Sequence, residues 1–218
     1  MSEGETPKRR LKPVRWLYAI AAGLAVALCG AAAGAWLAWE RITDEQANAR
    51  IERVSGPWRW NANDQMFSDP LSIARTAHFG PFPMRSDEVG YYVALADSSG
   101  ERLSGDHRYR LTGPLPRARF WSLAAYDEAG YLFENPQAKY SVSSETLSAA
   151  AGRDNAATQA FRAGAFNLLV GGAGGAPGTL PTGSGPMFLI LRVYQPEDPL
   201  FPGSDSAFPV AITRISET

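Results

Sequence analysis

Hydrophobic and polar positions divide the chain into an uncharged N-terminal stretch and a longer part in which the two kinds alternate. No charged residue occurs in the 24 positions from Trp16 to Trp39. Because an α-helix rises ~1.5 Å per residue, this stretch reaches ~36 Å, which is enough to cross the ~30 Å hydrocarbon core of a bilayer. Tryptophan at both ends suits the two headgroup regions. The pattern predicts a transmembrane helix over residues 16–39.

A cleaved signal peptide is the alternative for the same stretch. Signal peptides also have a basic start, an apolar middle and small residues near a cleavage site, which Ala31, Ala33 and Ala35 could supply. The apolar run continues beyond these residues to Trp39 and is longer than a usual signal core, which favours an uncleaved anchor.

Gly30 and Gly34 form a small-xxx-small pair within the predicted helix. Such a pair allows a second helix to approach closely, so both residues are candidates for helix packing. An alanine-rich helix that faces lipid would contain the same pair by chance, and this alternative stays open.

Basic residues before the span predict its orientation. Five Lys or Arg precede it, against Glu3 and Glu5, and the segment that begins at Glu40 has no such basic excess. Because basic flanks stay in the cytoplasm, residues 1–15 form a cytoplasmic tail and residues 40–218 lie outside. In a bacterium with two membranes, we therefore expect a single-pass inner-membrane protein with a periplasmic C-terminal domain. The lipid bilayer is its first partner.

Two helical segments are predicted between the span and the alternating region. Residues 40–54 have sparse apolar positions and end before Gly56-Pro57, which favours a helical stalk. Ser68-Asp69-Pro70 places a capping side chain before a proline and predicts a second helix that runs to about His78. We therefore expect residues 40–84 to be a helical stalk and connector.

From Val89 onward, apolar residues recur with a period of two, which is typical of β-strands. The predicted strands cover residues 91–96, 108–111, 120–126, 131–133, 139–142, 166–170, 187–194 and 210–215. Residues 171–185 are rich in glycine and predict a loop, while residues 145–162 stay open between helix and loop. Many short strands with few helices predict a β-sandwich or barrel over residues 85–218.

The charge and the cysteine content limit which partners are expected and how the outer domain can be stabilised. Beyond the N-terminal tail the chain has 16 basic and 20 acidic residues, a formal charge of −4. Nucleic-acid binding needs a basic face, so nucleic acid is not an expected partner. The single cysteine, Cys29, lies within the predicted span, so the outer domain must be stable without a disulfide.

The sequence contains no recognisable catalytic or metal-binding pattern. His78 is expected to cap a helix end and His107 to be exposed, and no Gly-x-Ser-x-Gly elbow is present. The two histidines are far apart, and neither has a second histidine or a cysteine close by. The glycine-rich run at Gly171 lacks the Lys-Ser/Thr of a phosphate-binding loop. We therefore assign no catalytic residue, no metal ligand and no cofactor.

Arg192 is the most suggestive polar residue. The period of two places it on the same strand face as Phe188, Ile190 and Tyr194, opposite Met187, Leu189, Leu191 and Val193. A charge on a partly aromatic face needs solvent, a carboxylate or a ring to pair with. The candidate binding residues are Arg192, Tyr194, Trp121, Tyr126 and Asp127.

Several runs in the alternating region resemble a known family. They are Tyr109–Pro116 (YRLTGPLP), Phe120–Asp127 (FWSLAAYD), Tyr140–Ser144 (YSVSS) and Phe188–Pro196 (FLILRVYQP). Together they resemble the bacterial domain of unknown function 1214, over roughly residues 85–216. The resemblance implies a jelly-roll-like antiparallel β-sandwich, which in longer relatives follows a second domain; here the membrane span takes that place.

This chain departs from the family pattern before the late strand. The family often has Asn-Trp-Leu-Pro where this chain has Gly178-Thr-Leu-Pro181. If that tryptophan belongs to a binding face, the face is altered here. The resemblance implies no established activity and therefore adds no catalytic residue.

These observations favour a non-catalytic, membrane-anchored β-sandwich that binds an envelope partner. That partner is either another membrane protein, docked along the span and stalk, or a glycan. The alternative is a hydrolase or lyase that acts on an envelope polysaccharide with carboxylates such as Asp127, Glu128 and Glu134. Asp127, however, lies where an aspartate commonly makes a hairpin turn.

Overall fold

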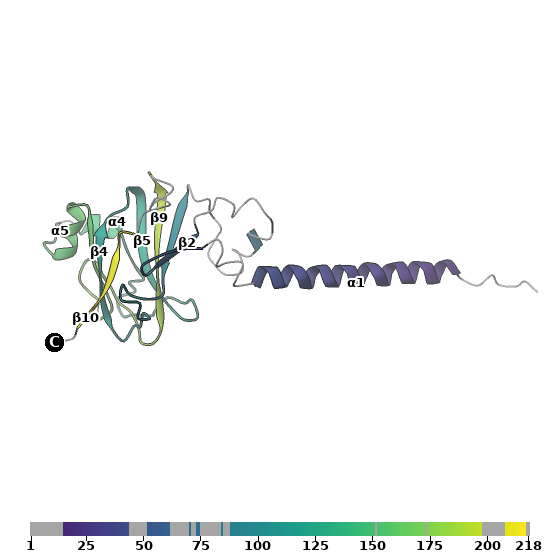
Figure 1. Ribbon diagram of the computed structural model, residues 1–218. Coiled ribbons are helices and arrows are strands. Elements are labelled where there is room, and N and C mark those ends of the chain that lie inside the picture. Colours follow the sequence, from purple (N-terminus) through teal and green to yellow (C-terminus); the bar gives the residue numbers. More distant parts are fainter. Residues whose placement is uncertain are drawn as a thin grey trace, which may run out of the picture. The chain divides into compact units, whose positions relative to one another are not determined.

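The computed structural model describes residues 15–43, 52–61, 70, 73–74, 84, 88–150, 152–172, 174–197 and 208–216. The chain divides into two compact units, Met1–Asp44 and Glu45–Thr218. A single helix forms the described part of the first unit, and the β-sheets belong to the second (Figure 1).

Helix α1 (Arg15–Thr43) has 29 residues, for a length of ~43 Å. Almost all of its described side chains are exposed, and Trp16–Thr43 is long and apolar enough to cross a membrane. The helix continues beyond the predicted span to Thr43, within the segment where a helical stalk was predicted, and the Thr43 hydroxyl donates a hydrogen bond to the Trp39 carbonyl at 3.0 Å. One long apolar helix near the N-terminus is compatible with an anchor or with a signal sequence.

The described strands of the second unit form two sheets. The six-stranded sheet has the order β1 (Glu52–Ser55), β2 (Trp58–Asn61), β3 (Val89–Ala94), β9 (Met187–Pro196), β5 (Ala118–Asp127), β6 (Ser141–Ser143), and all of its pairs are antiparallel. The four-stranded sheet has the order β10 (Ala211–Ile215), β4 (Arg108–Pro114), β7 (Ala165–Val170), β8 (Thr179–Leu180), in which only the β7–β8 pair is parallel. The structure confirms a mainly β chain with a sandwich-like core (Figure 1).

The alternation of side chains along the strands explains the core. In β9, Leu189, Leu191 and Val193 are each at most 1 % exposed, as the period of two predicts. The other sheet contributes the alternately buried residues of β7, and Trp121 packs edge-on against Phe166 with 4.8 Å between ring centroids. Burial of each such large apolar side chain contributes roughly 1.5–3 kcal/mol.

The prediction of helix up to residue 54 is wrong for its last residues, because Glu52–Ser55 is strand β1. Gly56-Pro57 does not end a helix but turns the chain into β2, with Gly56 at φ +56° in the first turn position. The indole of Trp58 is fully buried and donates to the Val210 carbonyl at 2.6 Å. This contact with the distant Val210 stabilises an extended conformation at Trp58, which the local sequence pattern did not indicate. The hairpin thus adds two strands from the range expected to be stalk and connector.

Other differences are smaller. The predicted loop 171–185 contains the short strand β8, and the predicted strand 131–133 contributes only an isolated bridge between Tyr126 and Leu132. Residues 145–162, left open above, contain the short helices α4 (Ser144–Ala149) and α5 (Ala156–Arg162). The other predicted strands correspond to β3, β4, β5, β6, β7, β9 and β10.

Most of the predicted helix from Pro70 to His78 lies outside the described residues. Within it, Pro70, Ile73 and Ala74 are helical. His78 itself and the stalk residues 44–51 also lie outside the described part of the chain.

Candidate functional site

The outward face of the six-stranded sheet carries a group of aromatic side chains around one arginine. Strand register places Arg192 of β9 between Tyr91 of β3 and Ser122 of β5. In the next row on the same face, Tyr194 pairs with Phe120. In the other direction, Phe188 pairs with Tyr126 two rows from Arg192. All six members of this aromatic face are half-buried: Tyr91, Phe120, Tyr126, Phe188, Arg192 and Tyr194.

Contacts within the aromatic face hold its side chains in place. The Arg192 guanidinium donates a hydrogen bond to the Tyr126 hydroxyl at 2.7 Å and lies 5.6 Å from the centroid of the same ring. The Tyr126 ring stacks on Phe188 at 5.4 Å with an interplanar angle of 14°. Because guanidinium is weakly hydrated and stacks well on aromatic rings, Arg192 is stable on this face.

A second aromatic contact extends the face along the sheet. The ring centroids of Phe120 and Tyr194 lie 5.4 Å apart on adjacent strands. Burial and the neighbouring Tyr194 raise the pKa of the Tyr91 hydroxyl above its ordinary 10.0, and Arg192 opposes this only partly. Tyr91 therefore stays protonated near neutral pH.

Three of the five predicted binding residues meet on this face: Arg192, Tyr194 and Tyr126. Asp127 follows Tyr126 at the end of β5, where its Oδ1 accepts a hydrogen bond from the Tyr131 N–H at 2.8 Å. This contact is the turn-forming role that an aspartate at this point predicts.

Trp121 does not belong to the candidate site. It is 2 % exposed and points into the core, where it packs against Phe166. The sequence contains the signal for this placement, since Trp121 shares its strand face with the apolar Leu123 and Ala125 and lies opposite Tyr126.

Sequence reasoning missed Tyr91 and Phe120 and did not select Phe188. Alternation already placed Phe188 beside Arg192 on β9. Tyr91 and Phe120 reach the face only through pairing of β3 and β5 with β9. That pairing joins segments far apart in the chain, and no local pattern specifies it.

The other residues that the sequence analysis weighed for catalysis contact a residue outside the aromatic face or are exposed. His107 Nδ1 lies 3.0 Å from a guanidinium nitrogen of Arg214, and Glu128 and Glu134 are exposed. Within the described residues, no group of three or more His, Cys, Asp or Glu comes together as a metal site would require. In α1, a Cβ added at Gly30 or Gly34 would meet nothing within 4 Å, so both positions are sterically open.

Comparison with known proteins gives a family and a fold. Residues 88–198 match the family described as "Protein of unknown function (DUF1214)". No curated protein matches the chain. Among solved structures, the chain is similar to the VPA0106 protein from Vibrio parahaemolyticus at 20 % identity and a TM-score of 0.53, over 70 % of this chain and 37 % of that one.

It is also similar to an uncharacterized protein from Burkholderia cenocepacia at 15 % identity and a TM-score of 0.38, over 59 % of this chain and 29 % of that one. The chain therefore spans little more than a third of the length of the Vibrio protein. At this level of identity the Vibrio structure shows a shared fold and says nothing about function.

Proposed function

Since the chain belongs to the DUF1214 family, we propose that it is a membrane-anchored, non-catalytic module that binds another protein of the bacterial envelope through the aromatic face. In this proposal α1 crosses the inner membrane once and the β-sandwich lies in the periplasm. The chain crosses between the two sheets from β3 to β4, β4 to β5, β6 to β7, β8 to β9 and β9 to β10, and these crossings favour a jelly-roll-like connectivity for that sandwich.

The composition and order of the aromatic face carry this proposal. Tyrosine and arginine are enriched among the residues that contribute most to protein–protein binding, especially where rings surround them. The contacts from Arg192 through Tyr126 to Phe188 already order these side chains, so a partner would pay little additional side-chain entropy. A pre-ordered face of this kind suits a protein partner.

The apolar helix supports a partner that is itself at the membrane. Anchoring confines the sandwich to a thin layer next to the bilayer, which raises its effective concentration toward other membrane proteins. Five basic residues before the span favour the orientation with the sandwich outside.

No described observation favours the hydrolase or lyase alternative. Hydrolysis by paired carboxylates needs two acidic groups that face each other across a substrate. Among the acidic residues considered, Asp127 holds a turn, and Glu128 and Glu134 are exposed.

The test is site-specific photo-crosslinking of the full chain in its native membranes. A photoreactive amino acid replaces Phe188 or Tyr194 on the aromatic face, or Thr213 or Arg110 as controls. These control residues are exposed and lie opposite each other in the other sheet. We expect the same discrete protein adduct from both face positions, none from the controls, and its loss in Arg192→Glu.

Equal adducts from both sheets, or none from the face, would contradict the proposal. An adduct that contains carbohydrate instead of protein would favour the glycan alternative for the same face.

A further inference from the structure

An open groove lies beside the edge strand β6, and no residue of the aromatic face lines it. It consists of two adjoining hollows of about 500 and 340 Å³ that share Lys139, Thr146 and Gly175. One wall is the segment 137–141 that leads into β6, another is α4 with the residues after it, and the third is the glycine-rich segment 175–178. Each hollow is within the size range of small-molecule sites. We call it the Lys139 groove.

The charges that line the groove are all positive. Lys139 and Arg153 line it, and no Asp or Glu is among the described lining residues. The half-buried Lys139 ammonium donates one hydrogen bond to the Ala176 carbonyl at 3.0 Å, which leaves two of its three N–H groups for a ligand. Burial lowers the pKa of this ammonium from its ordinary 10.5, and a bound anion would offset that desolvation.

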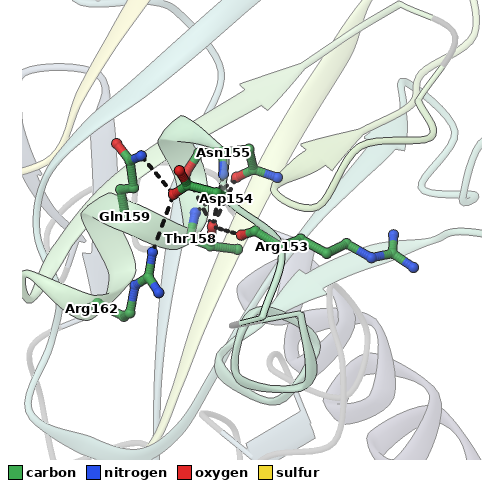
Figure 2. Close-up of polar contacts among 6 residues, drawn as sticks. All are labelled: Arg153, Asp154, Asn155, Thr158, Gln159 and Arg162. Carbon is green, nitrogen blue, oxygen red and sulfur yellow. Dashed lines mark hydrogen bonds and ion pairs between the residues drawn. The ribbon is translucent and has the colours of Figure 1, made fainter.

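The Arg153 backbone is fixed while its guanidinium is left available. The buried Thr158 hydroxyl donates to the Arg153 carbonyl at 2.5 Å. The neighbouring Asp154 contacts Gln159 at 2.8 Å and Arg162 at 3.5 Å instead of Arg153. Figure 2 shows the Arg153 side chain extending away from this network. Among the described residues, no acidic group neutralises the Arg153 guanidinium.

The larger hollow offers groups that suit a hydroxyl-rich ring. Ser141 and Gln137 line it with polar side chains, and Tyr140, 41 % exposed, adds an aromatic surface. Charged donors beside a tyrosine ring and a serine hydroxyl are the kinds of group that can hold an acidic sugar.

We propose that the Lys139 groove binds an acidic saccharide. Its anionic group lies between Lys139 and Arg153, and its sugar ring lies along Tyr140 and Ser141. Charge-assisted hydrogen bonds to the guanidinium and ammonium supply most of the affinity. This site is separate from the aromatic face, so binding of a protein and of a saccharide can be lost independently.

Calorimetric titration of the full chain in detergent tests the proposal. The probes are tri-galacturonate, glucose 6-phosphate, neutral maltotriose and inorganic phosphate. We expect tri-galacturonate to bind, to weaken as salt rises, and to lose at least about tenfold in affinity in both Lys139→Gln and Arg153→Gln. Arg117→Gln removes an exposed cation that lies 3.8 Å from Glu197, outside the groove, and should not change binding. Lys139→Arg should retain most of the affinity.

The thermal midpoint of each variant checks that it is folded. If Lys139→Gln does not fold, Lys139→Arg still tests the role of Lys139. Absence of tri-galacturonate binding, equal binding of maltotriose, or affinity unchanged in Lys139→Gln and Arg153→Gln would overturn the proposal. Tighter binding of glucose 6-phosphate would retain the saccharide and assign phosphate as its anionic group. Equal binding of inorganic phosphate would overturn the saccharide part. Loss of the protein adduct in Arg192→Glu with saccharide binding intact would confirm that the two sites are separate.

Discussion

Asp97 is a buried carboxylate that follows strand β3, with only 4 % of the residue exposed. Its Oδ1 accepts hydrogen bonds from the Ser99 N–H, the Ser99 hydroxyl and the Glu101 N–H at 2.6–3.1 Å. Burial alone would raise the pKa of this carboxyl, but these hydrogen bonds outweigh it and lower the pKa below 3.8. The charge is tolerated because the surrounding donors solvate it in place of water.

The lowered pKa predicts a pH-dependent contribution to stability. The folded pKa lies below the unfolded one, so the stabilisation is fully present above about pH 4 and is lost as the pH falls through the folded pKa. We expect Asp97→Asn to lower the free energy of unfolding by about 1–2 kcal/mol at pH 7, and the difference to shrink below pH 4.

Urea unfolding of the full chain in detergent at pH 7, 5 and 3, followed by tryptophan fluorescence, measures this difference. Glu128→Gln in an exposed turn serves as the control and should stay within about 0.5 kcal/mol of the unsubstituted chain. A deficit in Asp97→Asn that is the same at every pH would refute the assignment.

Trp58 joins the β1–β2 hairpin to the segment before β10. Besides its bond to Val210, its ring lies 5.1 Å from Phe208. Trp58→Phe leaves the Val210 carbonyl without its donor, and we expect a loss of about 1–3 kcal/mol in the free energy of unfolding. Trp58→Ala should cost about 3–5 kcal/mol, because it also removes a fully buried ring. Urea unfolding measures the free energy of unfolding of both variants, and Trp60→Phe at the half-buried Trp60 is the control. If Trp60→Phe and Trp58→Phe lower this free energy equally, the hydrogen bond from Trp58 to Val210 does not contribute to stability.

At the scale of elements, α4 and α5 illustrate helices too short to be stable by themselves. They have six and seven residues, and isolated helices of this length are unstable in water. Each begins with a capping box, Ser143 with Thr146 and Asn155 with Thr158. The caps satisfy the first N–H groups, and the buried Leu147 and Ala157 attach the helices to the core.

Removal of the α5 cap should loosen that helix and the Arg153 backbone before it. The Asn155 side chain accepts from the Thr158 N–H at 2.9 Å, so we expect Asn155→Ala to cost about 1 kcal/mol and Asn155→Asp to cost much less. Urea unfolding gives the free energies, and hydrogen exchange at the Thr158 amide reports the cap itself. Unchanged exchange of this amide in Asn155→Ala would contradict the prediction.

At the scale of the whole molecule, two units of different composition are joined in one chain. The described part of the first is an apolar helix with almost fully exposed side chains, and the second has its own core between two sheets. In the proposed anchored form, burial of these side chains in lipid is stabilising, because uncharged side chains of this kind prefer hydrocarbon to water.

This difference predicts the fate of the chain in a cell. We expect the polypeptide to stay in the membrane fraction after alkaline carbonate extraction, and a reporter fused after Thr218 to be active only if it requires the periplasm. A shorter polypeptide in the soluble fraction, trimmed near Ala35, would instead identify α1 as a signal sequence. Carbonate treatment of a peripheral membrane protein is the control, since it should release that protein.

The sequence by itself determined the features that depend on neighbours along the chain. The uncharged run predicted α1, and alternation located most strands and sorted Leu189 and Leu191 from Arg192, because a strand places successive side chains on opposite faces. Charge balance and the lone Cys29 also needed no structure.

Tertiary structure decided which strands pair and which features are brought together. Alternation defines two faces but does not say which of them packs on a second sheet, and pairing between distant strands has no local signal. Trp121, a predicted binding residue, lies in the core with Leu123 and Ala125, which share its strand face. The pattern also predicted helix for residues 52–54 of β1, because the contact between Trp58 and the distant Val210 has no local signal. The aromatic face and the Lys139 groove likewise combine segments that only the folded chain places together.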